Sequence, residues 1–247
     1  MATNLAGKFD AIKAEWQAGP RHPAVAASPP PVFVTIAREA GAGGRALAHQ
    51  LADRLTAMEP MSAPWRAFDR ELVEKVAADH DLSTTLIETL EQTSQNWLRY
   101  LLDSVIYPDD PGEIEVFRRV AATIRALGKA GRNIIVGRGG VFITSGLPGG
   151  VHVNLVAPKP TRIERLAQEL EIPKAQATSN LNRIDAARQD FYRRHFPNQT
   201  LNPEAFTITL NTALIDEPGM VEVLTPLITN REGRTRSRIQ HDLARAR

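Results

Sequence analysis

The stretch VFVTIAREAGAGGRALAHQLADRL, residues 32–55, decides the fold. It begins with a short apolar run rich in β-branched residues, which is typical of a strand. Gly41, Gly43 and Gly44 follow, and the leucines after them recur one turn apart, which predicts a helix. A glycine-rich turn between a strand and a helix suits phosphate, because the N–H groups at a helix N-terminus attract anions. The stretch is therefore either a phosphate-binding loop or a tight turn.

The glycine cluster matches the phosphate-loop pattern G-x-x-x-x-G-K-[ST] only in part. Aligned on Gly44, the first glycine is Glu39, the lysine is Arg45 and the hydroxyl residue is Ala46. Guanidinium keeps its charge and binds two oxygens at once, so Arg45 can hold phosphate. Ala46 cannot ligate Mg²⁺, so a metal would rely on water, phosphates or another side chain. From this motif alone, a nucleotide site and an ordinary glycine-rich turn both stay open.

Strand and helix patterns alternate through the rest of the chain. This alternation predicts a parallel sheet covered by helices on both faces, a three-layer α/β/α fold. Gly131 is placed to stop one helix, and Pro160 lies in the first turn of another. Strands are expected over 32–37, 65–68, 133–137, 151–157 and 206–211, and helices over 44–55, 70–80, 84–92, 113–130, 161–170, 174–196 and 217–229.

Composition excludes several classes of protein. The chain has 247 residues, 43% of them hydrophobic, which fits a globular domain with a real core. It has no cysteine, which excludes disulfides, thiolate metal sites and a cysteine nucleophile. No apolar run approaches the roughly 20 residues of a membrane-spanning helix, and the N-terminus does not read as a secretory signal. The six histidines lack metal-ligand spacing, so we expect no zinc site. A cytoplasmic enzyme is expected.

The two ends of the chain differ from its body. Residues 1–31 read as an extension with a proline-rich linker, either a loosely docked helix plus spacer or a partner-docking segment. Residues 231–247 hold six arginines against two carboxylates, a net charge of +4, which leaves −2 for the rest of a chain whose formal total is +2. The body is therefore not basic, and no specific nucleic acid is expected. The tail is predicted to be solvated or to touch an acidic partner weakly.

Six segments occur in an order that resembles a known family: TIAREAGAGGRALAHQLADRL, AFDRELVEKVAADHDLSTTLIETLEQ, NIIVGRGGVFI, RIERLAQ, DAARQDFYRRHF and TLNTALIDEPGMVEVL. The family is the cytidylate kinase-like family, a branch of the P-loop nucleoside monophosphate kinases. The resemblance implies a P-loop domain over 32–229, with a helical monophosphate-binding insertion at about 69–130 and a short lid at about 178–200. The extension 1–31 and the basic tail 230–247 would flank it.

The resemblance also implies roles for residues, with ATP and Mg²⁺ as cofactors. Arginine often replaces the P-loop lysine in this branch. The resemblance therefore implies that Arg45 is a feature of the branch and not a damaged motif. The ATP site would comprise Gly41, Ala42, Gly43, Gly44, Arg45, Ala46 and Asn211; the acceptor site Asp69, Arg138, Asp185 and Arg194; and the catalytic set Arg45, Arg138, Arg188 and Arg193.

Several of these residues also have a purely structural interpretation, whereas the sequence places no acidic residue near Arg138 that would give it one. Asp69 can cap a helix beginning at Arg70. Asp185 and Arg188 are three apart and can form a surface pair. Arg193 and Arg194 can belong to a solvated face. Arg162 and Arg165 can do the same, or serve as a lid hinge.

One departure concerns the acceptor. Cytidylate kinases proper carry an acidic residue directly after the arginine of the GR pair, and it helps to select cytosine; here that position is Gly139. The leading hypothesis is phosphoryl transfer from ATP to a nucleoside monophosphate, CMP or dCMP. The alternatives are a kinase of the same fold with a non-nucleotide acceptor, and a non-catalytic nucleotide-binding or scaffold protein, which Ala46 and the two appended ends suggest.

Overall fold

The computed structural model describes residues 31–69, 73 and 111–245. The predicted extension 1–31 lies outside this range apart from Pro31, and so do the predicted helices over 70–80, apart from Val73, and 84–92. Most of the predicted insertion at 69–130 therefore stays a prediction.

Five parallel strands form one sheet in the order β2-β3-β1-β4-β5. β1 lies in the centre of the sheet. The chain places β2 and β3 on one side of β1 and then crosses over to place β4 and β5 on the other side. A crevice opens at the carboxyl ends of strands where the order reverses in this way. The strands are β1 (Phe33–Arg38), β2 (Arg66–Phe68), β3 (Asn133–Val136), β4 (Gly150–Val156) and β5 (Ile208–Asn211).

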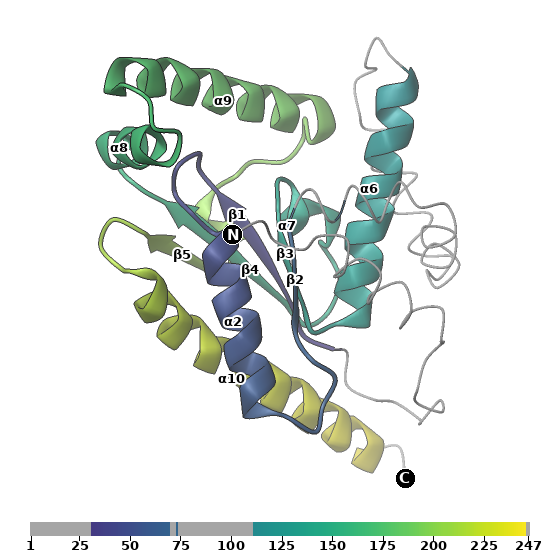
Figure 1. Ribbon diagram of the computed structural model, residues 1–247. Coiled ribbons are helices and arrows are strands. Elements are labelled where there is room, and N and C mark those ends of the chain that lie inside the picture. The colour runs from purple at the N-terminus through teal and green to yellow at the C-terminus, as the bar shows by residue number, and fades with distance from the viewer. Residues whose placement is uncertain (1–30, 70–72, 74–110, 246–247) are drawn as a thin grey trace.

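Helices cover both faces of the sheet (Figure 1). α2 (Arg45–Met58) and α10 (Glu217–Arg245) lie on one face, and α6 (Pro111–Ala130) and α7 (Gly140–Ile143) lie on the other. The side chains of β3 alternate accordingly: Ile134 and Val136 pack with the core of α2 and α10, whereas Ile135 packs with the core of α6 and α7. The predicted three-layer α/β/α fold is confirmed.

Two further helices lie across the carboxyl end of the sheet (Figure 1). α8 (Lys159–Glu169) and α9 (Lys174–His195) pack on each other through a small core of Leu166, Ala177 and Leu181. Ala40, from the loop after β1, is buried in the same core. The helix that carries the predicted lid residues therefore lies against the glycine loop.

Most predicted elements are present, and the exceptions are local. Gly131 ends α6 in the left-handed conformation, with φ of 71°. The four-residue helix α7 follows Gly139, which has φ of 73°, and no sequence period marks so short an element. The helix expected over 217–229 runs to Arg245, so the basic segment continues α10. Its arginines are good helix formers, and the separate role of the predicted tail 230–247 stays a prediction. Among the described helices, none is long and apolar enough to cross a membrane.

Candidate phosphate-binding site

The glycine loop joins the central strand β1 to α2. Gly41, Gly43 and Gly44 have φ of 71°, 83° and 117°, a region where only glycine is comfortable. Gly44 is the N-cap of α2, so the first N–H groups of that helix and the positive end of its dipole face the crevice. The loop therefore has the backbone form of an anion site.

Glu39 occupies the position of the first glycine in the phosphate-loop pattern, and its backbone explains why. Among the described residues, the non-glycine positions with positive φ are Arg132 and Glu171, so Glu39 needs no glycine. Its side chain turns toward the start of α8, where Oε2 accepts a hydrogen bond from the Ala157 N–H at 3.0 Å. The departure from the motif is therefore compatible with the loop.

Four arginines converge beside this loop: Arg38 at the end of β1, Arg45 at the start of α2, Arg138 after β3 and Arg188 on α9. Burial, then repulsion from the other three, lowers the pKa of Arg38 to about 10. Burial, then repulsion from Arg138, lowers the pKa of Arg188. Arg188 Nη1 also donates to the carbonyl oxygen of Arg38. Positive charge gathered this closely suits a polyanion such as the phosphates of a nucleotide.

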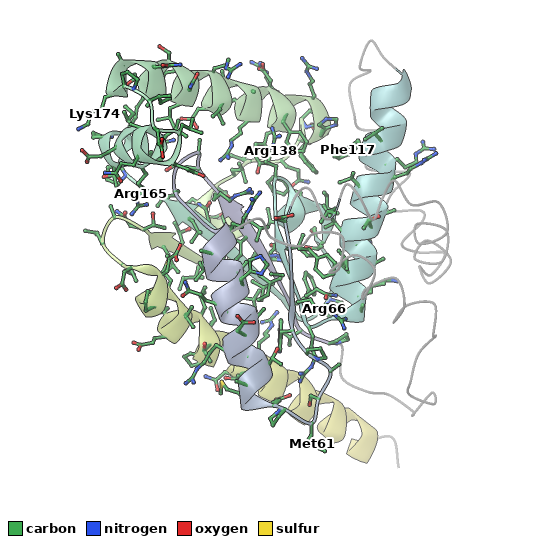
Figure 2. All side chains as sticks on the ribbon, viewed as in Figure 1. Met61, Arg66, Phe117, Arg138, Arg165 and Lys174 are labelled. Atoms are coloured by element: carbon green, nitrogen blue, oxygen red, sulfur yellow. The ribbon has the colours of Figure 1, made fainter. Side chains whose placement is uncertain are left out.

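A cavity of about 440 Å³ opens beside Arg138. The guanidinium carbon of Arg138 lies 4.8 Å from the centre of the Phe191 ring, which holds it in a cation–π contact. Figure 2 shows Arg138 beneath α9 and Phe117 on α6. The described residues that line the cavity are Val73, Val116, Phe117, Val120, Ile124, Ile135, Val136, Gly137, Arg138, Ala187, Asp190, Phe191, Arg194 and His195.

Two predicted acidic residues already have arginine partners. Asp69 Oδ2, just after β2, lies 3.4 Å from Arg45 Nε. Asp185 accepts from Arg162 Nη1 at 2.9 Å through Oδ2. The charge of Asp185 also opposes the lowering of the Arg188 pKa, so the expected interaction with Arg188 persists beside the contact with Arg162. That residue is 7% exposed, so the expectation of a solvated face for it is wrong.

The remaining predicted residues are spread more widely. Arg194 lines the cavity with Arg138. Arg193 pairs with Asp190, and its side chain is 77% exposed. Asn211 Oδ1 accepts from the Ala213 N–H at 3.0 Å and closes the turn after β5. The roles assigned to these residues stay predictions.

Arg165, the other arginine of α8, is also engaged. Its guanidinium donates to the hydroxyl and carbonyl oxygens of Thr212, at 2.7 and 2.6 Å. The arginine therefore joins α8 to the turn after β5, and the solvated face considered for it from the sequence does not hold.

Sequence reasoning missed two members of the site. Arg38 ends the central strand directly before the loop, so its position at the carboxyl edge was a usable signal. Tyr192 gave no such signal. Its hydroxyl accepts from the Gly139 N–H at 3.2 Å, and burial raises its pKa. Only the packing of α9 on α7 brings that contact about.

The residues at the loop fit a phosphate better than a bare metal ion. In the described part of the chain, no group of three or more histidines and carboxylates could hold a metal. Asp69 lies beside Arg45, the loop carboxylate Glu39 is bonded to Ala157 and lies near Arg162, and the Ala46 side chain offers no ligand atom. Since Mg²⁺ is commonly bound by one or two carboxylates together with substrate phosphates, it would arrive here on the nucleotide.

Comparisons with known proteins bear on the fold and the family of the chain. A solved structure of an uncharacterized protein from Eubacterium ventriosum is 17% identical, with a TM-score of 0.51, and the match covers 80% of this chain and 98% of that one. A shikimate kinase from Acinetobacter baumannii, in complex with shikimate, is 14% identical, with a TM-score of 0.39 and coverage of 81% and 94%. The search of curated proteins found no match. The model of the cytidylate kinase-like family matches residues 33–214, which confirms the resemblance. Because that match spans most of the sequence, the chain belongs to the cytidylate kinase-like family.

Proposed function

We propose that the protein transfers the terminal phosphoryl group of ATP to a nucleoside monophosphate, with CMP and dCMP the first acceptors to test. The convergence of Arg38, Arg45, Arg138 and Arg188 on the glycine loop carries this proposal. Phosphoryl transfer needs positioning and positive charge around the moving group, and it needs no nucleophile from the protein. Membership of a kinase-like family supports the same reaction class.

The arrangement suggests a division of labour. The loop backbone and Arg45 would hold the ATP phosphates, and Mg²⁺ on those phosphates would neutralise part of their charge. Arg138 lies between the loop and the cavity, so it would hold the acceptor phosphate. An oxygen of that phosphate forms the new bond to phosphorus as the bond to the departing ADP oxygen breaks. Arg188 on α9 would stabilise the charge between the two phosphates.

The test is ADP release from ATP and Mg²⁺ in the presence of CMP, dCMP, UMP, AMP or GMP. Turnover with at least one acceptor is expected, and Arg45→Ala should abolish most of it. Arg183→Ala is the matched control, because Arg183 is an exposed arginine of α9. Folded protein that releases no ADP with any of the five acceptors would contradict the proposal.

Gly139 favours a second candidate, a non-nucleotide acceptor. A Cβ atom at this position would lie 2.6 Å from Phe196 Cε2, and φ is 73°. An acidic residue of the kind that helps cytidylate kinases to select cytosine therefore does not fit here without repacking Phe196. The apolar walls of the adjacent cavity, among them Val120 and Ile124, also suit a less polar group than cytosine.

Mass spectrometry of the purified protein under native conditions separates the two candidates. A bound apolar phosphate ester or alcohol that also supports ADP release would favour the second. Saturable turnover with CMP or dCMP, and none with the copurified compound, would favour the first.

A further inference from the structure

Arg162, on α8, carries a buried charge that reaches two other segments. Its side chain is 8% exposed. Nε donates to the carbonyl oxygen of Ala157 at 3.1 Å, and Nη1 donates to that of Ala40 at 3.3 Å. Nη1 also donates to both carboxylate oxygens of Asp185, at 3.2 and 2.9 Å. One guanidinium therefore binds the glycine loop, the start of α8 and α9 at once.

The loop rests on Arg162 in more than one way. Glu39 Oε2 lies 3.5 Å from Arg162 Nε. The backbone of Arg162 also lies against the loop, because a Cβ atom added to Gly41 would lie 2.7 Å from the Arg162 carbonyl oxygen. A movement of Arg162 would therefore displace the first half of the loop.

On the other side, Asp185 connects Arg162 to a predicted catalytic residue. Asp185 and Arg188 are three positions apart on α9, so they share a face of the helix. Arg188 Nη1 donates to the carbonyl oxygen of Arg38 at the start of the loop. α9 is thus attached to the loop at two points, directly through Arg188 and indirectly through Asp185 and Arg162.

We propose that Arg162 is a positioning residue that couples the glycine loop to α9, so that the form of the loop and the place of Arg188 are set together. A buried charge with several partners has all its hydrogen bonds in one arrangement, and any other arrangement leaves the charge unpaired at a high free-energy cost. The loop and α9 should therefore move together. The kinetic consequence of this coupling rests on the proposed function, but the coupling itself does not.

The chain offers a matched control for the contact between α8 and α9. Lys174 Nζ and Glu164 Oε1 are 2.7 Å apart and join the same two helices, with side chains 70% and 55% exposed. Lys174 is labelled at the start of α9 in Figure 2. Neither residue is among the partners of the loop, so breaking this pair tests a helix–helix contact without the coupling.

Hydrogen exchange of the full-length, ligand-free protein tests the coupling. Asp185→Asn should speed amide exchange roughly tenfold in α9 and also in residues 39–44, to which Arg162 joins Asp185, because a charge-assisted bond to Arg162 is lost. Arg162→Gln should affect the same two segments, and Glu164→Gln should leave residues 39–44 unchanged. If Asp185→Asn speeds exchange in α9 alone, or in neither segment, the coupling is overturned. Asp185→Asn keeps the size of the side chain, so the test does not depend on Arg162→Gln folding.

Kinetics distinguish this inference from the proposed function. If the chain is a kinase, Asp185→Asn should lower kcat and raise KM for ATP together, each by roughly tenfold, because the loop and Arg188 would both be misplaced. Glu164→Gln should change neither. Wild-type protein without turnover would count against the proposed function, whereas the exchange experiment needs no nucleotide and would still decide the coupling.

Discussion

The two arginine groups beside the glycine loop are built from the same side chain and differ in what surrounds the charge. Arg38, Arg45, Arg138 and Arg188 lie near one another, and repulsion from the other three adds to burial in lowering the pKa of Arg38 to about 10. Arg162, on α8, donates its hydrogen bonds to carbonyl oxygens and to Asp185. In the first group the arginines repel one another, with Asp69 beside Arg45, whereas Arg162 is bonded directly to a carboxylate.

This difference separates ligand binding from architecture. Arginines gathered at a crevice raise the local positive potential, so the first group suits the binding of an anionic ligand. A buried and bridged arginine stabilises the arrangement that bridges it. Variants of the first group should therefore change activity, and variants of the second should change stability and the fit between elements.

The largest expected effect is on catalysis. Arg138→Met should lower kcat by about 10²–10³-fold, the usual cost of losing one group that stabilises transition-state charge. The free energy of unfolding should change by less than about 1 kcal/mol, as for most partly exposed positions. Steady-state assays and urea unfolding measure both quantities.

Arg183→Met serves as the control for that prediction. Arg183 is an exposed arginine of α9, so less than about threefold change is expected. Equal losses in the two variants would break the distinction between the arginine group at the loop and the surface of the same helix.

The second prediction concerns stability. Arg162→Met should lower the free energy of unfolding by about 3 kcal/mol, because Asp185 and two carbonyl groups lose their donor in a buried setting. Urea unfolding monitored by circular dichroism measures the change. A loss no larger than that of Arg138→Met would mean that the two groups do not differ as described.

A third prediction locates the pH dependence of stability away from both groups. Burial, then repulsion from Arg231, lowers the pKa of His152 to about 4, and its Nδ1 is hydrogen-bonded to the Thr35 hydroxyl at 2.8 Å. Between pH 4 and 6.5 the unfolded chain therefore binds more protons than the folded protein. The free energy of unfolding should fall by about 2 kcal/mol as the pH drops through this window.

His152→Asn should remove most of this dependence. Urea titrations at pH 4.5, 5.5 and 7 compare the variant with the wild type. An unchanged slope in the variant would assign the effect to another group.

The smallest expected difference lies between two glycines of the loop. Both have positive φ, which costs an alanine about 1–2 kcal/mol. A Cβ atom at Gly41 would also meet the Arg162 backbone at 2.7 Å, whereas one at Gly43 meets nothing within 4 Å. Gly41→Ala should therefore be less stable than Gly43→Ala by about 1–2 kcal/mol. Equal thermal midpoints of Gly41→Ala and Gly43→Ala would show that the loop is not packed against the backbone of Arg162.

The sequence was informative about elements and less so about contacts between them. Hydrophobic periods located the five strands and most described helices, because a buried face leaves a repeat in the chain. The period could not show that Arg162 is buried, since its partners Ala40 and Asp185 are 122 and 23 positions away. The same holds for Tyr192 and Gly139, which only the packing of α9 brings together.

The conformation of Glu39 has a consequence for recognising such loops in other chains. A sequence motif specifies a residue type, whereas the fold requires only a backbone angle. At position 39 the angle φ is not positive, so any L-residue can adopt it. Searches that require glycine here will overlook loops in which the first position has been freed to carry a side chain. A search pattern based on backbone angles would require glycine at the positions of Gly41, Gly43 and Gly44, where φ is positive. It would allow any residue at position 39, whose side chain here contacts the segment before α8.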